Sequence, residues 1–414
     1  MCPVAGLSSW RHTAEVPFRA GEILEFGTYI IGGLLRALTT ASHFRDAIID
    51  HRIMSSIKLA GMDISIHKYP ISDELRTWLL KELWSDSATS PQAVSLSMSP
   101  YFDYYSKRCQ RFSQDGGIHI CVKSHQGLVD ITEQILFVDA TRSDIQRLLG
   151  SRLGGPVEEK RTGAMNTTID LCGSLLLMAE VGVHEFGYSG CNPLAWSGPQ
   201  TLRQAVEQHF RCEKELQPDN PRLGALFTAR NLEYIGGMKI KWTTNIVDHL
   251  LLSDDDQTVF IFHCVGFLRF QQRTTLGFRL PLFPDSFIDE TLRTLALLFP
   301  QNDRKSRRWL RAQVTEHNLD PHIARCGNLR AQNRRFEHFS FWHDRLIILK
   351  QAFDESSPRG LRQWWNDRRN SVQWSTFWVA ILVFAMTVFF GLVQSVEGAL
   401  QVYLSWKALK GEGL

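Results

Sequence analysis

The sequence predicts an α+β fold, in which a mostly helical body carries a small antiparallel sheet and is followed by one C-terminal transmembrane helix. Three observations lead to this prediction. Apolar residues recur every three or four positions in several segments, which is typical of amphipathic helices. Residues 238–262 contain alternating and β-branched stretches that favour a small sheet. Residues 374–393 contain no charged side chain, and twenty such residues match one helical crossing of a bilayer.

Residues 1–155 are predicted to form a helix-rich N-terminal region. Ser72–Trp84 has helical apolar spacing and opens with polar residues that can cap a helix. Ile118–Val122, which follows the turn residues Asp115 to Gly117, and Ile135–Val138 are predicted as short strands because they are rich in β-branched residues. Three glycines and a proline in Gly150–Pro156 mark the end of this region.

Residues 156–300 are predicted to form a second, α+β region. Helices are expected at Asn166–Val181, Thr201–Phe210 and Asp285–Phe299. The sheet is expected from Ile240 and Trp242, which alternate with lysines, and from the apolar run Thr258–Phe262.

An acidic run, Ser253 to Asp256, separates these two β-prone stretches and is interpreted as a tight turn. Three consecutive aspartates also suggest calcium binding, but the central glycine and terminal glutamate of an EF-hand loop are missing. Trp242 is interpreted as a core anchor rather than a platform on which a ligand stacks. No metal site and no cofactor are predicted.

Residues 301–373 are predicted to be basic juxtamembrane helices, including one long helix over 329–355. Residues 301–370 hold fifteen Lys and Arg against eight Asp and Glu, a net charge of +7, although the whole chain is only +3. Basic clusters beside a membrane anchor are attracted to anionic lipid headgroups, and we expect this partner, although ordinary solvated helix faces have the same composition. Nucleic acid is not expected as a partner, because no zinc finger or RNA-binding motif accompanies the clusters. The clusters are Arg304, Lys305, Arg307, Arg308 and Arg311; Arg330, Arg334 and Arg335; and Arg359–Arg369.

Residues 374–394 form the predicted single-pass transmembrane helix, and 395–414 a short lumenal or exterior tail. Positive charge precedes the apolar stretch, whereas Lys407 and Lys410 in the tail are balanced by Glu397 and Glu412. Because cytoplasmic flanks retain Lys and Arg, the N-terminal body is predicted to face the cytosol, in a tail-anchored arrangement. The organelle cannot be read from the sequence. The residues expected at the cytosolic membrane interface are Arg359, Arg362, Trp364, Trp365, Arg368, Arg369, Trp374 and Trp378.

A buried helix at the end of a soluble domain is the alternative to a membrane span, although core helices are usually shorter and carry a polar face.

Two further features concern the side of the membrane on which the body lies. The eight cysteines include no CxxC pair, which fits reduced thiols in the cytosol. Asn166-Thr167-Thr168 is a glycosylation sequon that should stay unmodified if the body is cytosolic.

Three separated motifs resemble a large family of uncharacterised fungal proteins that have a C-terminal single-pass membrane helix. The first is KIKWTTNIVDHL, Lys239–Leu250, and the second is FWHDRL, Phe341–Leu346. The third is VQWSTFW, Val372–Trp378, continued by FFGLVQSVEGALQVY, Phe389–Tyr403. The resemblance covers roughly residues 165–405 and implies a fungal origin and a membrane helix. It implies no reaction and no catalytic residue.

Catalytic motifs give little support for an enzyme. The sequence contains no Walker loop, dinucleotide-binding loop or HExxH zinc motif. Gly187 to Cys191 resembles a nucleophile elbow but ends in cysteine where glycine is required. The remaining weak candidates are Asp248, His249 and His263, because a carboxylate beside an imidazole can orient a general base. Each of the three is also a common structural residue in turns and cores.

Two functional hypotheses therefore follow from the sequence. The first is a non-enzymatic, tail-anchored module that recruits or scaffolds protein partners at a membrane. The second is a membrane-held enzyme that acts on an apolar metabolite through Asp248, His249 and His263. If these three side chains converge in a concave pocket, the enzyme hypothesis is favoured.

Overall fold

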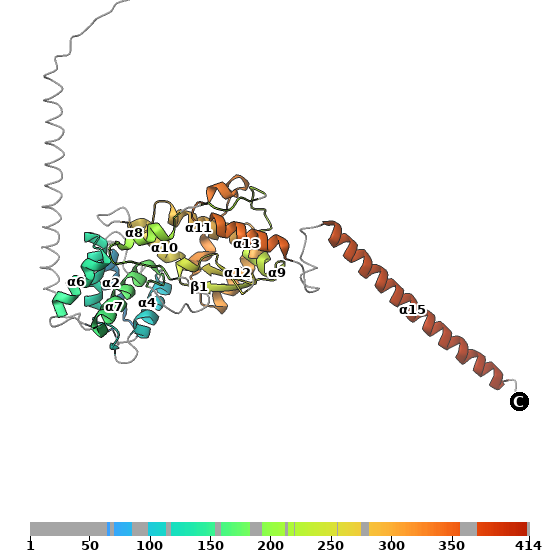
Figure 1. Cartoon of the computed structure of the whole chain (residues 1–414). Coiled ribbons are helices and arrows are strands. Elements are labelled where there is room, and N and C mark those ends of the chain that lie inside the picture. Colours follow the sequence, from blue (N-terminus) through green and yellow to red (C-terminus); the bar gives the residue numbers. More distant parts are fainter. Residues whose placement is uncertain are drawn as a thin grey trace, which may run out of the picture. The chain divides into compact units, whose positions relative to one another are not determined.

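The computed structural model describes residues 64–66, 70–84, 98–112, 117–153, 159–182, 193–211, 214–218, 220–254, 256–274, 281–356 and 371–411 (Figure 1). The predictions for residues 1–63, for Gly187 to Cys191 and for the flank 359–369 lie outside these ranges. The described chain is mainly helical and contains one small sheet, so the predicted α+β class is confirmed. The predicted divisions at residues 155 and 300 stay predictions.

The first part of the body is a group of helices around α7. They are α2 (Asp73–Trp84), α4 (Ser99–Phe112), α5 (His125–Glu133), α6 (Arg142–Leu153) and α7 (Glu159–Leu177). The apolar face of α7 contacts α4, α5 and α6, and its second half from Leu171 onward is buried. Two phenols of α4 fix its position, because Tyr101 and Tyr104 donate hydrogen bonds to the carbonyls of Leu175 and Ser174 near the end of α7.

Neither predicted strand in this part of the chain forms. Ile118 is 74% exposed and lies in a turn, where Gly117 adopts a left-handed φ of 71°. Ile135–Val138 belongs to a short π-helix, η2 (Gln134–Val138), which directly continues α5. Ile135 and Leu136 are buried there as part of a helical face. Both predictions were wrong because β-branched residues favour strands only weakly, and tertiary contacts override that preference.

Two shorter helices follow. In α8 (Leu202–His209), Thr201 accepts a hydrogen bond from the Gln204 N–H, and the Gln204 side chain accepts one from the Thr201 N–H. This reciprocal pair is a capping box and explains why the helix begins at the predicted place. In α9 (Ala229–Tyr234), Thr228 caps the first turn.

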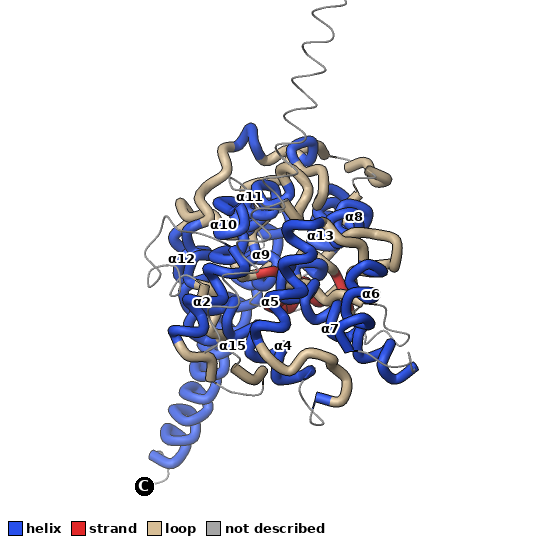
Figure 2. The backbone as a smooth tube through the Cα atoms, turned by 90° about the vertical axis from the view of Figure 1, so that its left-hand side faces the viewer, coloured by secondary structure: helices blue, strands red, loops and turns tan. Residues whose placement is uncertain are grey.

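The sheet has the strand order β1-β3-β2 and lies among the helices (Figure 2). Strands β1 (Lys239–Thr243) and β3 (Thr258–Phe262) form where the sequence predicts them. Between them in the sequence lies β2 (Leu252–Ser253), a strand of two residues. The β2–β3 pair is antiparallel as expected, but β1 and β3 are parallel, with Lys239 opposite Thr258. The sheet is therefore mixed. A short 3₁₀ helix, η3 (Ile246–Asp248), connects β1 to β2.

The described residues of the acidic run between β2 and β3 form a turn. Asp254 and Asp256 have left-handed φ angles of 56° and 62°, and Asp254 accepts a hydrogen bond from the Gln257 N–H at 3.1 Å. Aspartate tolerates this conformation better than most residues, which is why the sequence signal was reliable here.

The last part of the body packs α10 (Val265–Thr274) against α11 (Phe287–Leu298), and adds α12 (Arg304–Glu316) and α13 (His343–Glu355). The long helix predicted over 329–355 is confirmed only for α13. Upstream of it lie two short 3₁₀ helices, η5 (Ala331–Asn333) and η6 (Phe336–His338). The helix cannot start earlier because the buried Glu290 carboxylate accepts the N–H groups of residues 340–342, which a continuous helix would use itself.

The C-terminal element is a single uninterrupted helix, α15 (Ser371–Gly411), of 41 residues. It includes the predicted membrane segment and continues through most of the predicted tail. At 1.5 Å per residue, it measures about 60 Å, roughly twice the thickness of a hydrocarbon core.

Candidate functional site

The apolar part of α15 is a candidate membrane span. Residues Trp374–Leu409 are long and apolar enough to cross a bilayer, and none of the most apolar window is buried against the rest of the protein. This exposure favours a membrane span over the alternative of a buried core helix, which other elements would cover. Trp374 and Trp378 lie one helical turn apart, with ring centroids 6.1 Å from each other and ring planes tilted by 58°, at the end where the headgroup region is expected.

The other predicted interface residues, Arg359, Arg362, Trp364, Trp365, Arg368 and Arg369, lie outside the described residues. The orientation of α15 in a membrane therefore stays a prediction.

A second candidate surface is the basic face of α12. Its five cationic side chains are all exposed, whereas Trp309 and Leu310 are buried on the opposite face. Trp309 is held by a hydrogen bond from Nε1 to Glu233 of α9 at 2.6 Å. The basic residues of this face are Arg304, Lys305, Arg307, Arg308 and Arg311.

Trp242 on β1 packs beside this helix, and its ring centroid lies 5.8 Å from that of Phe299 and 6.4 Å from that of Trp309. Its indole N–H donates to Gln313 at 3.2 Å. The half-buried indole thus joins the sheet to α12 at the edge of the core.

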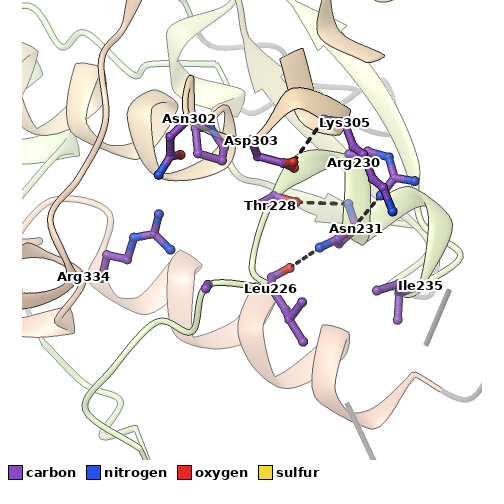
Figure 3. A pocket seen from close by; sticks show the side chains of 11 residues that line it. Leu226, Thr228, Arg230, Asn231, Ile235, Asn302, Asp303, Lys305 and Arg334 are labelled. Carbon is purple, nitrogen blue, oxygen red and sulfur yellow. Dashed lines mark hydrogen bonds between the residues drawn. The ribbon is translucent and has the colours of Figure 1, made fainter. Parts of the chain in front are cut away.

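A cleft adjoins the start of α12, and we call it the basic cleft. It consists of two neighbouring hollows of ≈ 480 and ≈ 720 Å³, which share Ala225, Leu226, Asn302 and Arg334. The segment before α9, the loop before α12 and the segment around η5 form its walls. Figure 3 shows Arg334 at one side of the first hollow, and Arg230 and Lys305 at the other.

His249, one of the candidate catalytic residues, is fully buried in a hydrogen-bonded cluster. Its Nδ1 accepts the Phe262 N–H at 3.2 Å, so Nε2 carries the proton and donates to the Thr294 hydroxyl at 2.7 Å. The Trp342 ring lies edge-on to the imidazole, with centroids 4.8 Å apart. Burial, together with the positive charge of Arg345, lowers the pKa of His249 to about 3. The imidazole is thus neutral at physiological pH, and both of its nitrogens are occupied.

Arg345 holds the turn that contains Asp248 and His249. The guanidinium donates from one nitrogen to the carbonyls of Val247 and His249, at 2.6 and 2.7 Å. Asp248 is 2% exposed and accepts a hydrogen bond from Asn245 at 2.8 Å. Burial lowers the pKa of Arg345, and the charge of Asp248 opposes that shift.

The motifs Lys239–Leu250 and Phe341–Leu346 therefore meet in one buried cluster, which we call the motif cluster. It consists of Asn245, Asp248, His249, Thr291, Thr294, Trp342 and Arg345. Its hydrogen bonds run between η3, α11 and α13 and connect the sheet to both helices.

His263, the third candidate, has a different set of partners. Its Nδ1 accepts the backbone N–H of Asp320 at 3.3 Å. Burial lowers the pKa of His263 to about 4, against the opposing charge of Asp320. The Asp320 carboxylate itself caps α10 through the Gly266 N–H at 2.6 Å and accepts the His322 N–H at 2.9 Å. His263 is thus part of the link between β3, α10 and the segment 320–322.

In the described part of the chain, no hydrogen bond joins His249 to His263, and none of the three candidates lines the basic cleft. Among the same residues, no group of three His, Cys, Asp or Glu side chains is arranged to hold a metal ion. The hydrogen bonds of the candidates serve to position secondary-structure elements.

Sequence reasoning missed the residues that organise these places, namely Arg345, Glu290 and Asp320. Each acts on a partner at least fifty positions away in the chain, so no local spacing signals its role. Arg334 was noted only as a member of a basic cluster, because its place in a cleft depends on the folded chain.

Comparisons of the chain with protein-family models, with curated proteins and with solved structures found no match. The functional argument therefore rests on the residues and their geometry.

Proposed function

We propose that the protein is a tail-anchored membrane protein whose body faces the cytosol and recruits or scaffolds partners at the membrane surface. The observation that carries this proposal is α15, a helix whose apolar side chains are exposed over more than the length of one bilayer crossing. Exposure of such a surface to water is unfavourable by about 25 cal/mol per Å², and a lipid environment removes that cost.

The arginines that precede α15 in the sequence support the cytosolic orientation. The exposed basic face of α12 supports contact with anionic lipid headgroups, because each nearby cation contributes on the order of 1 kcal/mol at such a surface. The alternative of an enzyme that uses Asp248, His249 and His263 gains no support from their geometry, since both nitrogens of His249 and Nδ1 of His263 are engaged within the core.

Glycosylation mapping tests the orientation. We would add a sequon after Leu414 and express the chain in cells. The added acceptor should be glycosylated and the native Asn166 should not, because only the C-terminal end would reach the lumen. The measurement is the endoglycosidase-sensitive shift in gel mobility of the native chain, the extended chain and the Asn166→Gln variant of each.

Asn166 lies within α7, and its side-chain oxygen accepts a hydrogen bond from Gln146 at 2.8 Å. The Asn166→Gln variant therefore also serves to show whether any sugar depends on this position. A shift that disappears with Asn166→Gln, in a chain whose added acceptor stays unmodified, would reverse the proposed orientation.

A further inference from the structure

The basic cleft has an excess of positive charge that the protein itself does not neutralise. Two carboxylates face five cations, and both carboxylates are engaged. Asp354 pairs with Lys350 on the same helix, and Asp303 accepts the N–H groups of Lys305 and Ser306 at the start of α12. Among the described residues, Arg222, Lys305 and Arg334 form no ion pair. The five cations are Arg222, Arg230, Lys305, Arg334 and Lys350.

Arg334 shows most clearly that the cleft lacks a counter-charge. Its backbone is fixed, because the Leu223 N–H donates to the Arg334 carbonyl at 2.8 Å and the Phe336 N–H donates to Pro221 at 3.1 Å. The guanidinium is half-buried, and its Nε is hidden from solvent without a hydrogen-bond partner. A guanidinium stays protonated even where burial lowers its pKa, as it does here. An anion bound at the guanidinium would supply the counter-charge that no described residue provides.

The opposite side of the first hollow offers two further cationic side chains. Arg230 packs over the Tyr234 ring, 4.7 Å from its centroid, and donates to the Asn231 side chain at 3.2 Å. Lys305 extends from the first turn of α12 (Figure 3). The N–H groups of that turn are already capped by Asp303, so an anion would be bound by side chains rather than by the helix end.

We propose that the basic cleft binds a phosphate group, held between the Arg334 guanidinium on one side and Arg230 and Lys305 on the other. A guanidinium presents parallel N–H donors that match phosphate oxygens, and several separate cations suit a group of more than one negative charge. The same chemistry is offered by a small phosphorylated metabolite and by the headgroup of a phosphoinositide.

Calorimetric titration of the full chain in neutral detergent with inorganic pyrophosphate tests the proposal. Arg334→Gln should weaken binding about tenfold or more, because it removes charge-assisted hydrogen bonds. Lys305→Gln, a change at an exposed position, should also weaken binding, which guards against a folding defect of the first variant. The matched control is Arg335→Gln, since Arg335 is the next residue, carries the same charge and pairs with Glu337 at 3.1 Å outside the cleft. It should change the affinity by less than about twofold.

A second arm distinguishes the two sources of phosphate. The full chain is reconstituted into phosphatidylcholine vesicles with and without a phosphoinositide, and hydrogen exchange of residues 221–231 is measured. Protection by pyrophosphate in detergent, lost in Arg334→Gln, indicates a soluble ligand. Protection only in phosphoinositide vesicles, again lost in Arg334→Gln, indicates a headgroup.

The proposal is overturned if neither arm gives protection or binding, or if Arg335→Gln weakens binding as much as Arg334→Gln does. The second result would mean that general positive charge attracts the probe. Neither outcome depends on the orientation of α15, so the proposed function can fail separately.

Discussion

At the scale of single residues, neutral imidazoles stabilise the core. His125, His249 and His263 are all buried, and burial lowers the pKa of each, to about 4, 3 and 4 respectively. In the unfolded chain, each returns to an ordinary pKa of about 6.5. Because the folded-state pKa is the lower one, the stabilisation is complete above pH 6.5 and is lost as the pH falls from there toward 4.

This linkage predicts the response of the protein to mild acid. Each of the three histidines should lower the free energy of unfolding by about 1.4 kcal/mol between pH 7.5 and pH 5.5. His249→Gln should therefore be less stable at pH 7.5 but lose less stability on acidification. Urea unfolding of the full chain in detergent at both pH values, followed by tryptophan fluorescence, measures the difference. An unchanged pH dependence in the variant would contradict the account, because it would show that folding does not shift the pKa of His249.

Arg345 should be the most sensitive residue of the motif cluster. Arg345→Met removes the donor to two carbonyls and leaves the buried Asp248 charge with less compensation. We expect a loss of about 3 kcal/mol in the free energy of unfolding. Arg147→Met is the matched control, because the Arg147 side chain is 78% exposed and pairs with Asp144 one turn away. It should cost less than about 0.5 kcal/mol in the same urea titration.

The sequence identified candidate residues by their chemistry but could not assign their partners. Asp248, His249 and His263 stand out because few side chains can move protons, yet each is bound to groups that come close only in the fold. Thr294 and Arg345 occur 45 and 96 positions after His249. Local spacing carries no information about such contacts, so a catalytic and a structural histidine look the same in the sequence.

At the scale of elements, the sequence predicted helices and strands correctly where several local signals agreed, and incorrectly where β-branched residues were the main signal. The helices α2, α8 and α11 and the strands β1 and β3 form at or near their predicted positions, because caps, turns and periodicity agree there. The two failed strands before residue 140 had β-branched residues but no partner strand. The parallel β1–β3 pair also could not be foreseen, because sequence periodicity defines strands but not their neighbours.

The apolar stretch of α15 is an element whose function depends on composition. Phe384 lies near the middle of residues 374–393 and is 71% exposed. Phe384→Arg should disfavour membrane insertion by about 3 kcal/mol and shift the protein toward the soluble fraction. Leu409→Arg is the control, because Leu409 is equally exposed but lies at the far end of the helix, where an arginine can reach the headgroups. Equal membrane fractions of both variants after cell fractionation would contradict the predicted depth.

At the scale of the whole molecule, the chain combines a helical body with a long apolar C-terminal helix. The body uses its buried polar residues to join elements, and it presents a basic helix face and the basic cleft at its surface. A bilayer suits the apolar helix, and a phosphate group, from a lipid headgroup or a soluble ligand, suits the basic side chains.

Alkaline carbonate extraction of cell membranes tests membrane anchoring most directly. The full chain should remain in the membrane pellet, whereas a chain that ends at Arg369 should appear in the supernatant, because the truncation removes α15 and leaves the described body residues intact. Release of the full chain by carbonate would contradict the account, since it would show that the apolar helix does not insert into the bilayer.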